Sequence, residues 1–451
     1  MNGREQWASK LGFILAAVGS AVGLGNIWRF SYVAGESGGA AFLLIYVICI
    51  FLIGLPVLLA EFTIGRKGQT DVIAAFTSKA PGKPWVLGGF FGLAASFFIL
   101  SFYGVIAGWV LYYIYSYFTG TAGAVEEGGY GDFFESFIGS SGGPIFWQVL
   151  FMAIVIGIVY FGVKKGIELS NKIFMPLLAV ILLFLAGFSL TLDGASEGLQ
   201  FLFSPEWSAF GDAEVWSAAV GQAFFTLSLG MGAMITYSSY LSKDNRLPSA
   251  AGTVVVLDTL FAIVAGLVIF PAVFSFGIDP GDGPGLIFVT LPEVFNLMGG
   301  GGTVFAIFFF ILVALAALSS AISLLEVSVA FVMRKFNWAR KQAALVVGLL
   351  ITAVGIPSAL SQGGPLTEAT IAGLPFLDFV DTLTDMYFLP LGGLMIALFV
   401  GWGWRREDAF RESDLTGSSI APLWIWFLRI VAPLGILWIL YLNVVNTPFF
   451  Q

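Results

Sequence analysis

Histidine is absent from the 451-residue chain, and cysteine occurs once, at Cys49. Without histidine the chain has no imidazole to bind a metal ion or to relay protons. A single cysteine excludes a disulfide within the chain. Charged residues are scarce, at 11% of the sequence, and no cluster of Lys and Arg suggests a nucleic-acid partner. We also find no metal-ligand cluster, nucleophile–base pair or nucleotide-binding loop, and therefore do not expect an enzyme.

Apolar residues, in contrast, make up 58% of the chain. Soluble domains contain about 45–50%, so the composition indicates an integral membrane protein embedded in the lipid bilayer. Stretches long enough to cross a membrane as helices are expected at 11–35, 39–65, 86–119, 145–162, 168–191, 213–241, 250–277, 301–333, 339–357, 376–403 and 421–446.

The basic residues predict the orientation of these eleven spans. If the N-terminus is cytoplasmic, nineteen of the 20 Lys and Arg fall in cytoplasmic loops or at cytoplasmic helix ends. The exception is Arg29, inside the first span. We therefore expect a multi-pass protein of the cell membrane, with its N-terminus in the cytoplasm and its C-terminus outside.

The first span is interrupted in its middle. Three glycines fall within the seven residues 19–25, and Asn26 and Arg29 follow them. Span six is interrupted in the same way, at Ser228, Gly230 and Gly232. Irregular backbone is tolerated at membrane depth only where it is buried or lines a cavity. Two broken helices five spans apart are typical of a transporter built from inverted repeats with a midplane binding site, although glycine also serves close helix packing.

Four segments resemble the neurotransmitter:sodium symporter family: GSAVGLGNIWRF at 19–30, FFTLSLGMG at 224–232, GLIFVTLP at 285–292 and ALAALSSAISLLE at 314–326. The resemblance implies the all-α LeuT fold, in which two inverted five-helix repeats with broken helices 1 and 6 are followed here by one extra helix, as in the prokaryotic eleven-span branch. We expect the first repeat at 1–200, the second at 201–405 with an outer lid at 279–299, and a cytoplasmic loop with span eleven at 406–451.

A first sodium site is implied by the family pattern. It would use the carbonyl of Ala21, the side chains of Asn26 and Thr226, and the carboxylate of a bound amino acid. The family supplies an asparagine from span seven, and here that position matches Asp258. Chloride-dependent members have a hydroxyl one helical turn further on, where this chain has Ala262. We therefore expect that Asp258 supplies the negative charge and that chloride is not required.

A second sodium site is implied between spans one and eight. Its ligands would be the carbonyls of Gly19, Val22 and Ala316 and the hydroxyls of Ser319 and Ser320. Small residues and serines in span eight also serve plain helix packing. Both sites together suggest two sodium ions per substrate.

The substrate site is expected at the break in span one. Backbone amides around Leu24 and Gly25 begin a half-helix, where the partial positive charge suits a carboxylate. Gly23 stands where amine-carrying family members have an aspartate, which favours an amino acid as substrate. By resemblance, the full site comprises Ala21, Gly23, Leu24, Gly25, Ile99, Tyr103, Phe225, Thr226, Ser228, Met231, Ser320 and Leu324.

Two gates are also implied by the resemblance. The outer gate would pair Arg29 with Asp381 above Tyr103 and Phe225. The inner gate would use Arg4, Trp7 and Tyr240, although the usual acidic partner of Arg4 is replaced by Arg334 at the end of span eight.

The sequence thus favours sodium-coupled import of a hydrophobic L-amino acid, aromatic ones included, by alternating access. No charged side chain is expected in the pocket, and Met231 is flexible enough to yield to large rings. A small amino acid or osmolyte such as glycine, alanine or betaine remains an alternative cargo. A channel is disfavoured because no span carries a continuous polar stripe, and a non-transporting sensor because no signalling tail is visible.

Overall fold

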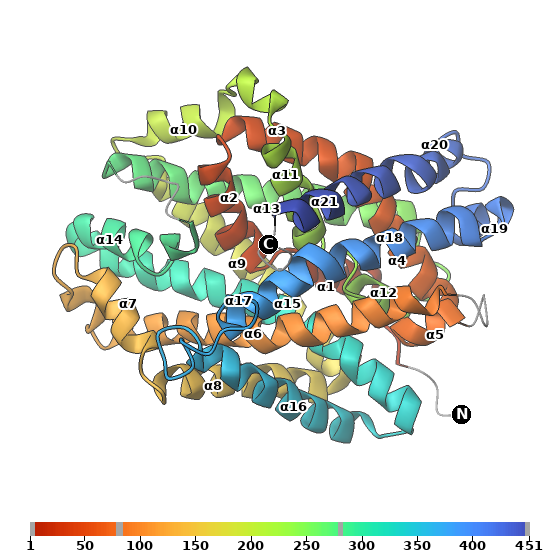
Figure 1. Ribbon diagram of the computed structural model, residues 1–451, viewed down its shortest axis with the longest axis horizontal. Coiled ribbons are helices and arrows are strands. Elements are labelled where there is room, and N and C mark those ends of the chain that lie inside the picture. Colours follow the sequence, from red (N-terminus) through yellow and green to blue (C-terminus); the bar gives the residue numbers. More distant parts are fainter. Residues whose placement is uncertain (1–4, 78–83, 278–282, 447–451) are drawn as a thin grey trace.

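Helices form almost all of the computed structural model, which describes residues 5–77, 84–277 and 283–446 (Figure 1). These ranges contain no β-strand. Nine of their helices are long and apolar enough to cross a membrane: Ala40–Gly68 (α3, η2 and α4), Val86–Phe118 (α6), Gly143–Tyr160 (α8), Val163–Ser189 (η4 and α9), Leu247–Ser275 (α13), Gly299–Phe336 (η7 and α15), Arg340–Leu360 (α16), Phe376–Gly403 (α17, η8, α18 and η9) and Ala421–Val445 (α20, η10 and α21).

Two further spans are broken, as the sequence predicts. The first consists of α1 (Lys10–Ala21), the π-helical turn η1 (Gly25–Arg29) and α2 (Phe30–Glu36), with a bend of 48° at the break. The second consists of α11 (Ala213–Thr226) and α12 (Ala233–Ser238), separated by a non-helical stretch. If α1 with η1 and α2 counts as one span, the described residues contain ten helical spans that are long and apolar enough to cross a membrane. The helices α11 and α12 occupy the remaining expected stretch, at 213–241, and the ends of all these segments lie within five residues of those predicted.

The break between α11 and α12 depends on glycine. Ser228, Gly230 and Gly232 all have positive φ, at 52°, 77° and 74°. Glycine adopts this conformation without the steric cost that other residues meet. At Gly230 a Cβ atom would also lie 2.3 Å from the carbonyl oxygen of Leu389 in α18. The glycines therefore allow both the turn and the close approach of α18.

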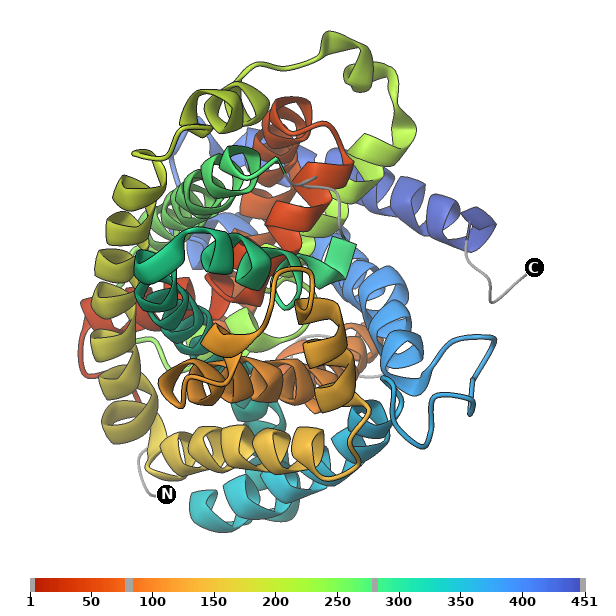
Figure 2. The ribbon, with the colours of Figure 1, turned by 90° about the vertical axis from the view of Figure 1, so that its left-hand side faces the viewer.

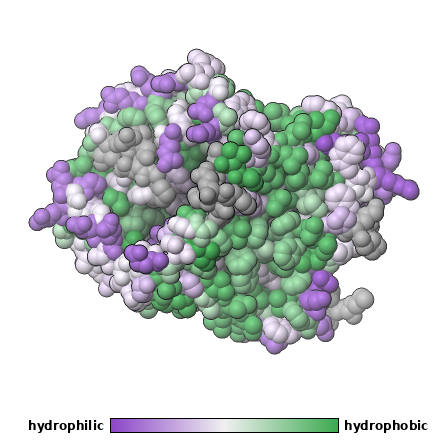
Figure 3. Space-filling view, viewed as in Figure 1, coloured by the Kyte–Doolittle hydropathy of each residue, from purple (hydrophilic) through white to green (hydrophobic). Residues whose placement is uncertain are grey.

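Shorter helices cover the two ends of the bundle. At one end, on the left of Figure 1, lie α7 (Tyr130–Ile138), α10 (Ala195–Phe203) and α14 (Thr290–Leu297), and at the other lie α5 (Val72–Thr77) and α19 (Arg406–Glu412). Figure 2 views the molecule from the α14 end. Hydrophobic residues form a broad surface band between the two ends, which carry the hydrophilic residues (Figure 3). A membrane is expected to surround this band.

The predicted outer lid at 279–299 lies partly outside the described residues, which resume at Gly283. From there the chain forms η6 (Gly283–Leu286) and then α14. Between them Phe288 is buried, and its carbonyl accepts a hydrogen bond from the hydroxyl of Tyr113 in α6. The remaining short turns are η3 (Ala122–Ala124) and η5 (Trp207–Gly211).

Candidate functional site

A small cavity lies where the two broken spans meet α6 and α15. Its volume is about 20 Å³. Eleven of the twelve residues predicted to bind substrate line it, and Thr226 does not. The lining residues are Ser20, Ala21, Gly23, Leu24, Gly25, Ile99, Tyr103, Phe225, Ser228, Met231, Ser320 and Leu324.

Backbone groups from the break in span one face this cavity. The Leu24 amide donates to the hydroxyl of Tyr103 at 3.4 Å. A Cβ atom at Gly23 would lie 2.2 Å from the Ser320 hydroxyl, and one at Gly25 would lie 2.7 Å from the ring of Phe225. Glycine at these positions therefore leaves the backbone accessible and lets α6, α11 and α15 approach it.

The carboxylate of Asp258 accepts three side-chain hydrogen bonds beside this break. The donors are the amide of Asn26 at 2.8 Å, the hydroxyl of Thr226 at 3.0 Å and the hydroxyl of Tyr46 at 3.4 Å. Asp258 is fully buried in α13, and within the described residues it forms no ion pair. A buried carboxylate is costly without a compensating charge. Because Asn26 lies in the break of span one, this oxygen-rich group adjoins the break and is suited to a small monovalent cation.

The five atoms predicted for the second sodium site also lie together, between α1 and α15. The Ser319 hydroxyl donates to the carbonyls of Ala316 at 2.9 Å and Val22 at 3.4 Å. The Ser320 hydroxyl lies 3.4 Å from the Gly19 carbonyl. These are neutral oxygen ligands, which suit a hard monovalent cation. No group of three or more His, Cys, Asp or Glu side chains that could hold a metal ion occurs in the described part of the chain.

Ser20, Gln222 and Ser323 are polar residues near these sites that were not identified from the sequence. The hydroxyl of Ser20 donates to that of Ser323 at 2.7 Å, and Ser228 donates to the Ser20 carbonyl at 2.7 Å, so serines connect both broken spans to α15. The side chain of Gln222 donates to the Gly25 carbonyl at 2.7 Å. The signal available was a polar residue inside an apolar span, which we applied to Asp258 but not to these residues.

Asn171 in α9 is a further residue that the sequence analysis missed. Its side-chain oxygen is buried and has no hydrogen-bond partner in the described part of the chain. A Cβ atom added at Gly19 would lie 2.2 Å from this oxygen. Its side-chain nitrogen donates to the Ile167 carbonyl at 2.9 Å. An oxygen acceptor thus adjoins one of the carbonyls predicted to bind the second sodium.

A larger cavity of about 340 Å³ lies on the α14 side of the small one. Leu24, Tyr103 and Phe225 line both cavities. These three side chains therefore form a partition one residue thick between the two cavities. The guanidinium of Arg29 stacks over the Phe225 ring, 4.8 Å from its centroid. An access route from the α14 end would pass this partition.

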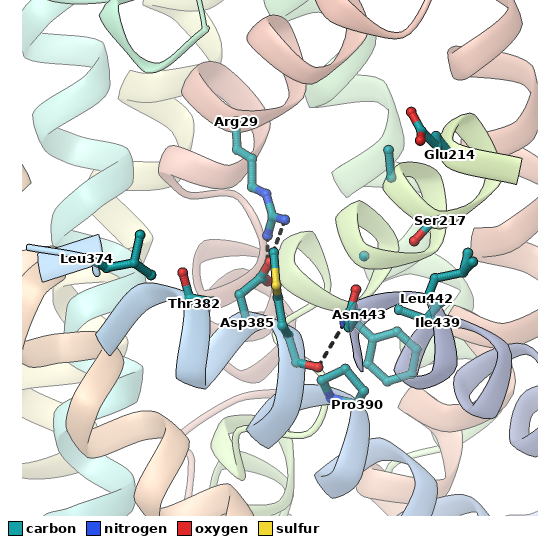
Figure 4. Close-up of a pocket in the computed structure, with 14 residues that line it drawn as sticks. Arg29, Glu214, Ser217, Leu374, Thr382, Asp385, Pro390, Ile439, Leu442 and Asn443 are labelled. Carbon is teal, nitrogen blue, oxygen red and sulfur yellow. Dashed lines mark hydrogen bonds and ion pairs between the residues drawn. The ribbon is translucent and has the colours of Figure 1, made fainter. Parts of the chain in front are cut away.

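The partner of Arg29 differs from the one expected. Both terminal nitrogens of Arg29 donate to the carboxylate of Asp385, at 2.7 Å each (Figure 4). Asp381 lines the larger cavity one helical turn earlier but does not form this ion pair. Asp385 lies in the π-helical turn η8 (Thr384–Phe388), whose wider winding alters which side chains face Arg29. The prediction of Asp381 is therefore corrected to Asp385.

The Arg29–Asp385 pair separates the larger cavity from a third one. This cavity, of about 390 Å³, lies between α11, α18 and α21 and is lined by residues such as Glu214, Ser217 and Asn443 (Figure 4). Asn443 in α21 donates to the Met386 carbonyl at 2.9 Å, which fixes the last span against η8.

At the opposite end, Trp7 is packed against Tyr237 and Tyr240, and its indole donates to the Tyr237 carbonyl at 2.8 Å. Tyr240 donates to Glu326 at 2.5 Å, and Glu326 pairs with Arg340 at 2.7 Å. Two of the three predicted inner-gate residues thus lie together. Arg4 lies outside the described residues.

Arg334, which occupies the position of the expected acid, pairs with Asp71. The charge of Arg334 is therefore balanced by an acid from the segment before α5. Arg340 also pairs with Glu5, at 3.1 Å. The two acids that bind Arg340 therefore come from the N-terminal segment and from α15.

Comparison with known proteins places the chain among sodium-dependent transporters. The model of the sodium:neurotransmitter symporter family matches residues 4–124 and 135–450. The chain is 42% identical to the uncharacterised sodium-dependent transporter YhdH of Bacillus subtilis, over 98% of both chains. It is 35% identical to a sodium-dependent transporter of Haemophilus influenzae, again over 98% of both chains.

Among solved structures, the chain is similar to MhsT in a crystal structure with L-phenylalanine. The TM-score is 0.91 at 61% identity, and the match covers 98% of this chain and all of the other. The expected LeuT fold, with its broken helices 1 and 6, is confirmed by this match. The names of the relatives also confirm a transporter rather than an enzyme.

Proposed function

The chain belongs to the sodium:neurotransmitter symporter family and is a sodium-dependent membrane transporter, and from this premise we propose that it imports a hydrophobic L-amino acid with two sodium ions. The N-terminus is cytoplasmic and the C-terminus outside. The proposal rests on the break in span one, where one short stretch of chain contributes to both sodium sites and to the substrate cavity. Gly19 and Val22 serve the second sodium site, Ala21 and Asn26 the first, and Leu24 and Gly25 the substrate cavity. A cation bound there shapes the substrate site directly.

Two features support a hydrophobic amino acid as cargo. The cavity is lined by Ile99, Phe225, Met231 and Leu324 and by no charged side chain. The structural neighbour MhsT was solved with L-phenylalanine. The substrate carboxylate would meet the Leu24 amide and the Tyr103 hydroxyl, in place of the hydrogen bond that these two now make with each other.

Transport without chloride is supported by the surroundings of Asp258. The hydroxyls of Tyr46 and Thr226 both donate to its carboxylate. Ala262, one turn further along α13, offers no polar atom. The negative charge that balances the first sodium is thus supplied by the Asp258 side chain and not by a bound chloride ion.

The decisive experiment is uptake of labelled phenylalanine, tryptophan and leucine into proteoliposomes under an inward sodium gradient. Potassium replaces sodium in one series, and gluconate replaces chloride in another. We expect uptake that requires sodium and is indifferent to chloride. Uptake that persists in potassium would contradict both cation sites, and uptake that fails in gluconate would contradict the role of Asp258.

A smaller cargo is the second candidate, because the cavity of about 20 Å³ has room for little more than one water molecule, and a small cargo requires less movement of the walls than an aromatic one. Met231 is the flexible side chain that would have to yield. Competition by alanine, glycine or betaine against labelled leucine distinguishes the two. Strong competition by these small compounds, with none by tryptophan, would favour the smaller cargo.

A further inference from the structure

A basic cavity lies at the α19 end of the molecule, far from the transport site (Figure 1). Its volume is about 380 Å³. Hydrophilic residues gather at this end beside the hydrophobic band (Figure 3). The sequence predicts only a cytoplasmic loop before span eleven, whereas the structure folds Arg406–Glu412 into α19, which packs against α4. The cavity is lined by Lys67, Gly403, Trp404, Arg405, Asp408, Arg411 and Glu412.

Positive charge exceeds negative charge in this lining, with three basic and two acidic side chains. Glu412 pairs with Lys67, and Asp408 pairs with Arg411 at 2.5 Å. Arg405 is exposed and forms no ion pair within the described part of the chain. The two acids therefore balance the charges of Lys67 and Arg411, and the guanidinium of Arg405 is available to bind an anion from outside the protein.

Trp404 adds a second donor. Its indole N–H is buried and has no hydrogen-bond partner among the described residues. Its ring packs edge-on against Phe399, with centroids 5.7 Å apart, so the side chain is held in place. A buried donor without an acceptor is costly, and Trp404 is one of the residues that line the cavity.

The cavity also adjoins exposed apolar side chains. Trp402, Ile420 and Trp426 expose 62%, 61% and 48% of their surface. Trp402 lies in η9 beside the lining residue Gly403, and Ile420 and Trp426 lie at the two ends of α20, which packs against η9. Arg429 stacks on the Trp402 ring at 5.1 Å from its centroid. Tryptophan paired with arginine is typical of the boundary between hydrocarbon and headgroups. The cavity therefore lies at headgroup depth, with surface for acyl chains next to it.

From these observations we infer that this cavity binds the phosphate of an anionic phospholipid. Arg405 and the Trp404 indole bind the phosphate oxygens, and the acyl chains lie over Trp402, Ile420 and Trp426. Basic pockets between membrane helices recognise such headgroups. A soluble phosphate compound would use the same donors, but it would leave the adjacent apolar surface uncovered.

The test is native mass spectrometry of the whole purified transporter, titrated with phosphatidylglycerol or with phosphatidylcholine. We expect tighter binding of phosphatidylglycerol. Arg405→Gln should weaken it about fivefold, the effect of one basic residue near a membrane surface. Trp404→Phe, which keeps a ring but removes the N–H, should weaken it as well. The matched control is Arg406→Gln, because Arg406 stacks on Phe410 and does not line the cavity.

Equal loss in Arg406→Gln and Arg405→Gln would indicate general surface charge and overturn the site. Unchanged binding in both Arg405→Gln and Trp404→Phe would overturn it too. Glycerol 3-phosphate tests the source: if it displaces phosphatidylglycerol fully at millimolar concentration, the cavity binds soluble phosphates and the lipid assignment is wrong. The readout is binding alone, so it is independent of the proposed transport activity.

Discussion

Asn26 donates from its side-chain amide to the carboxylate of Asp258 at 2.8 Å, which joins the broken first span to the middle of α13. Thr226 donates to the same carboxylate from the other broken span. One buried acid thus connects both breaks to a continuous helix.

Asp258→Asn should create a need for chloride. The substitution keeps the size of the side chain but removes the negative charge beside the first sodium. We expect sodium affinity to fall about tenfold, equivalent to the loss of about 1.4 kcal/mol. Adding Ala262→Ser should supply the missing hydroxyl, so that uptake by the double variant becomes faster in chloride than in gluconate. Uptake by both variants that ignores chloride and keeps the sodium affinity of the parent would refute this assignment.

Ser319→Ala should weaken sodium binding. The hydroxyl lies within 3.4 Å of the Val22 carbonyl and 2.9 Å of the Ala316 carbonyl, so its loss removes one ligand from the second cation site. We expect the sodium dependence of uptake to shift about tenfold to higher concentration. Ser328→Ala is the matched control, because Ser328 is buried in the same helix and its hydroxyl has no hydrogen-bond partner among the residues that the structure describes. A shift of equal size in the control would point to helix packing instead.

Gly23→Ala should abolish uptake without unfolding the protein. The new Cβ atom would lie 2.2 Å from the Ser320 hydroxyl and 3.3 Å from the Tyr103 hydroxyl, so it pushes on groups of the cation and substrate sites together. Gly187→Ala in α9, where a Cβ atom meets nothing within 4 Å, should transport normally. Sodium-dependent uptake and thermal unfolding are measured on both variants. Normal uptake by Gly23→Ala would mean that the backbone there does not face the substrate.

Asp385→Asn should leave the outer route open for longer. The pair with Arg29 is about four-fifths buried, so a neutral partner weakens it markedly. Ile106 lines the larger cavity, so Ile106→Cys places a reactive thiol there. The natural Cys49 is buried and should not react with the label. We expect an impermeant maleimide to label Ile106→Cys several-fold faster when Asp385→Asn is present. Asp381→Asn serves as the control, and faster labelling there alone would restore Asp381 as the gate partner.

The spans and the cavity were predictable because local sequence determines them. Hydropathy sets where a helix enters and leaves the membrane, and the glycines near Gly23 and Gly230 mark the breaks. Eleven residues of the cavity follow from these breaks and from the family motifs.

Side-chain pairing was harder to predict, since it depends on how distant helices pack. Asp381 and Asp385 lie four residues apart on one helix, and only the π-helical turn at Thr384–Phe388 decides between them. The Arg334–Asp71 pair joins parts of the chain 263 residues apart, and no local pattern signals it. The contact of Tyr46 with Asp258 was not predicted, because an aromatic residue in an apolar span is usually a hydrophobic core residue.

The partition formed by Leu24, Tyr103 and Phe225 has a consequence for the timing of the transport cycle. On the α14 side, a substrate is separated from the larger cavity by one layer of side chains, which change rotamer within nanoseconds when space allows. On the other side, Trp7 is held by a ring cluster and by its bond to the Tyr237 carbonyl, so opening requires a chain segment to move. Collective movements of that kind take microseconds to milliseconds. Under the import direction proposed above, we expect opening on the α19 side to be slower than opening on the α14 side.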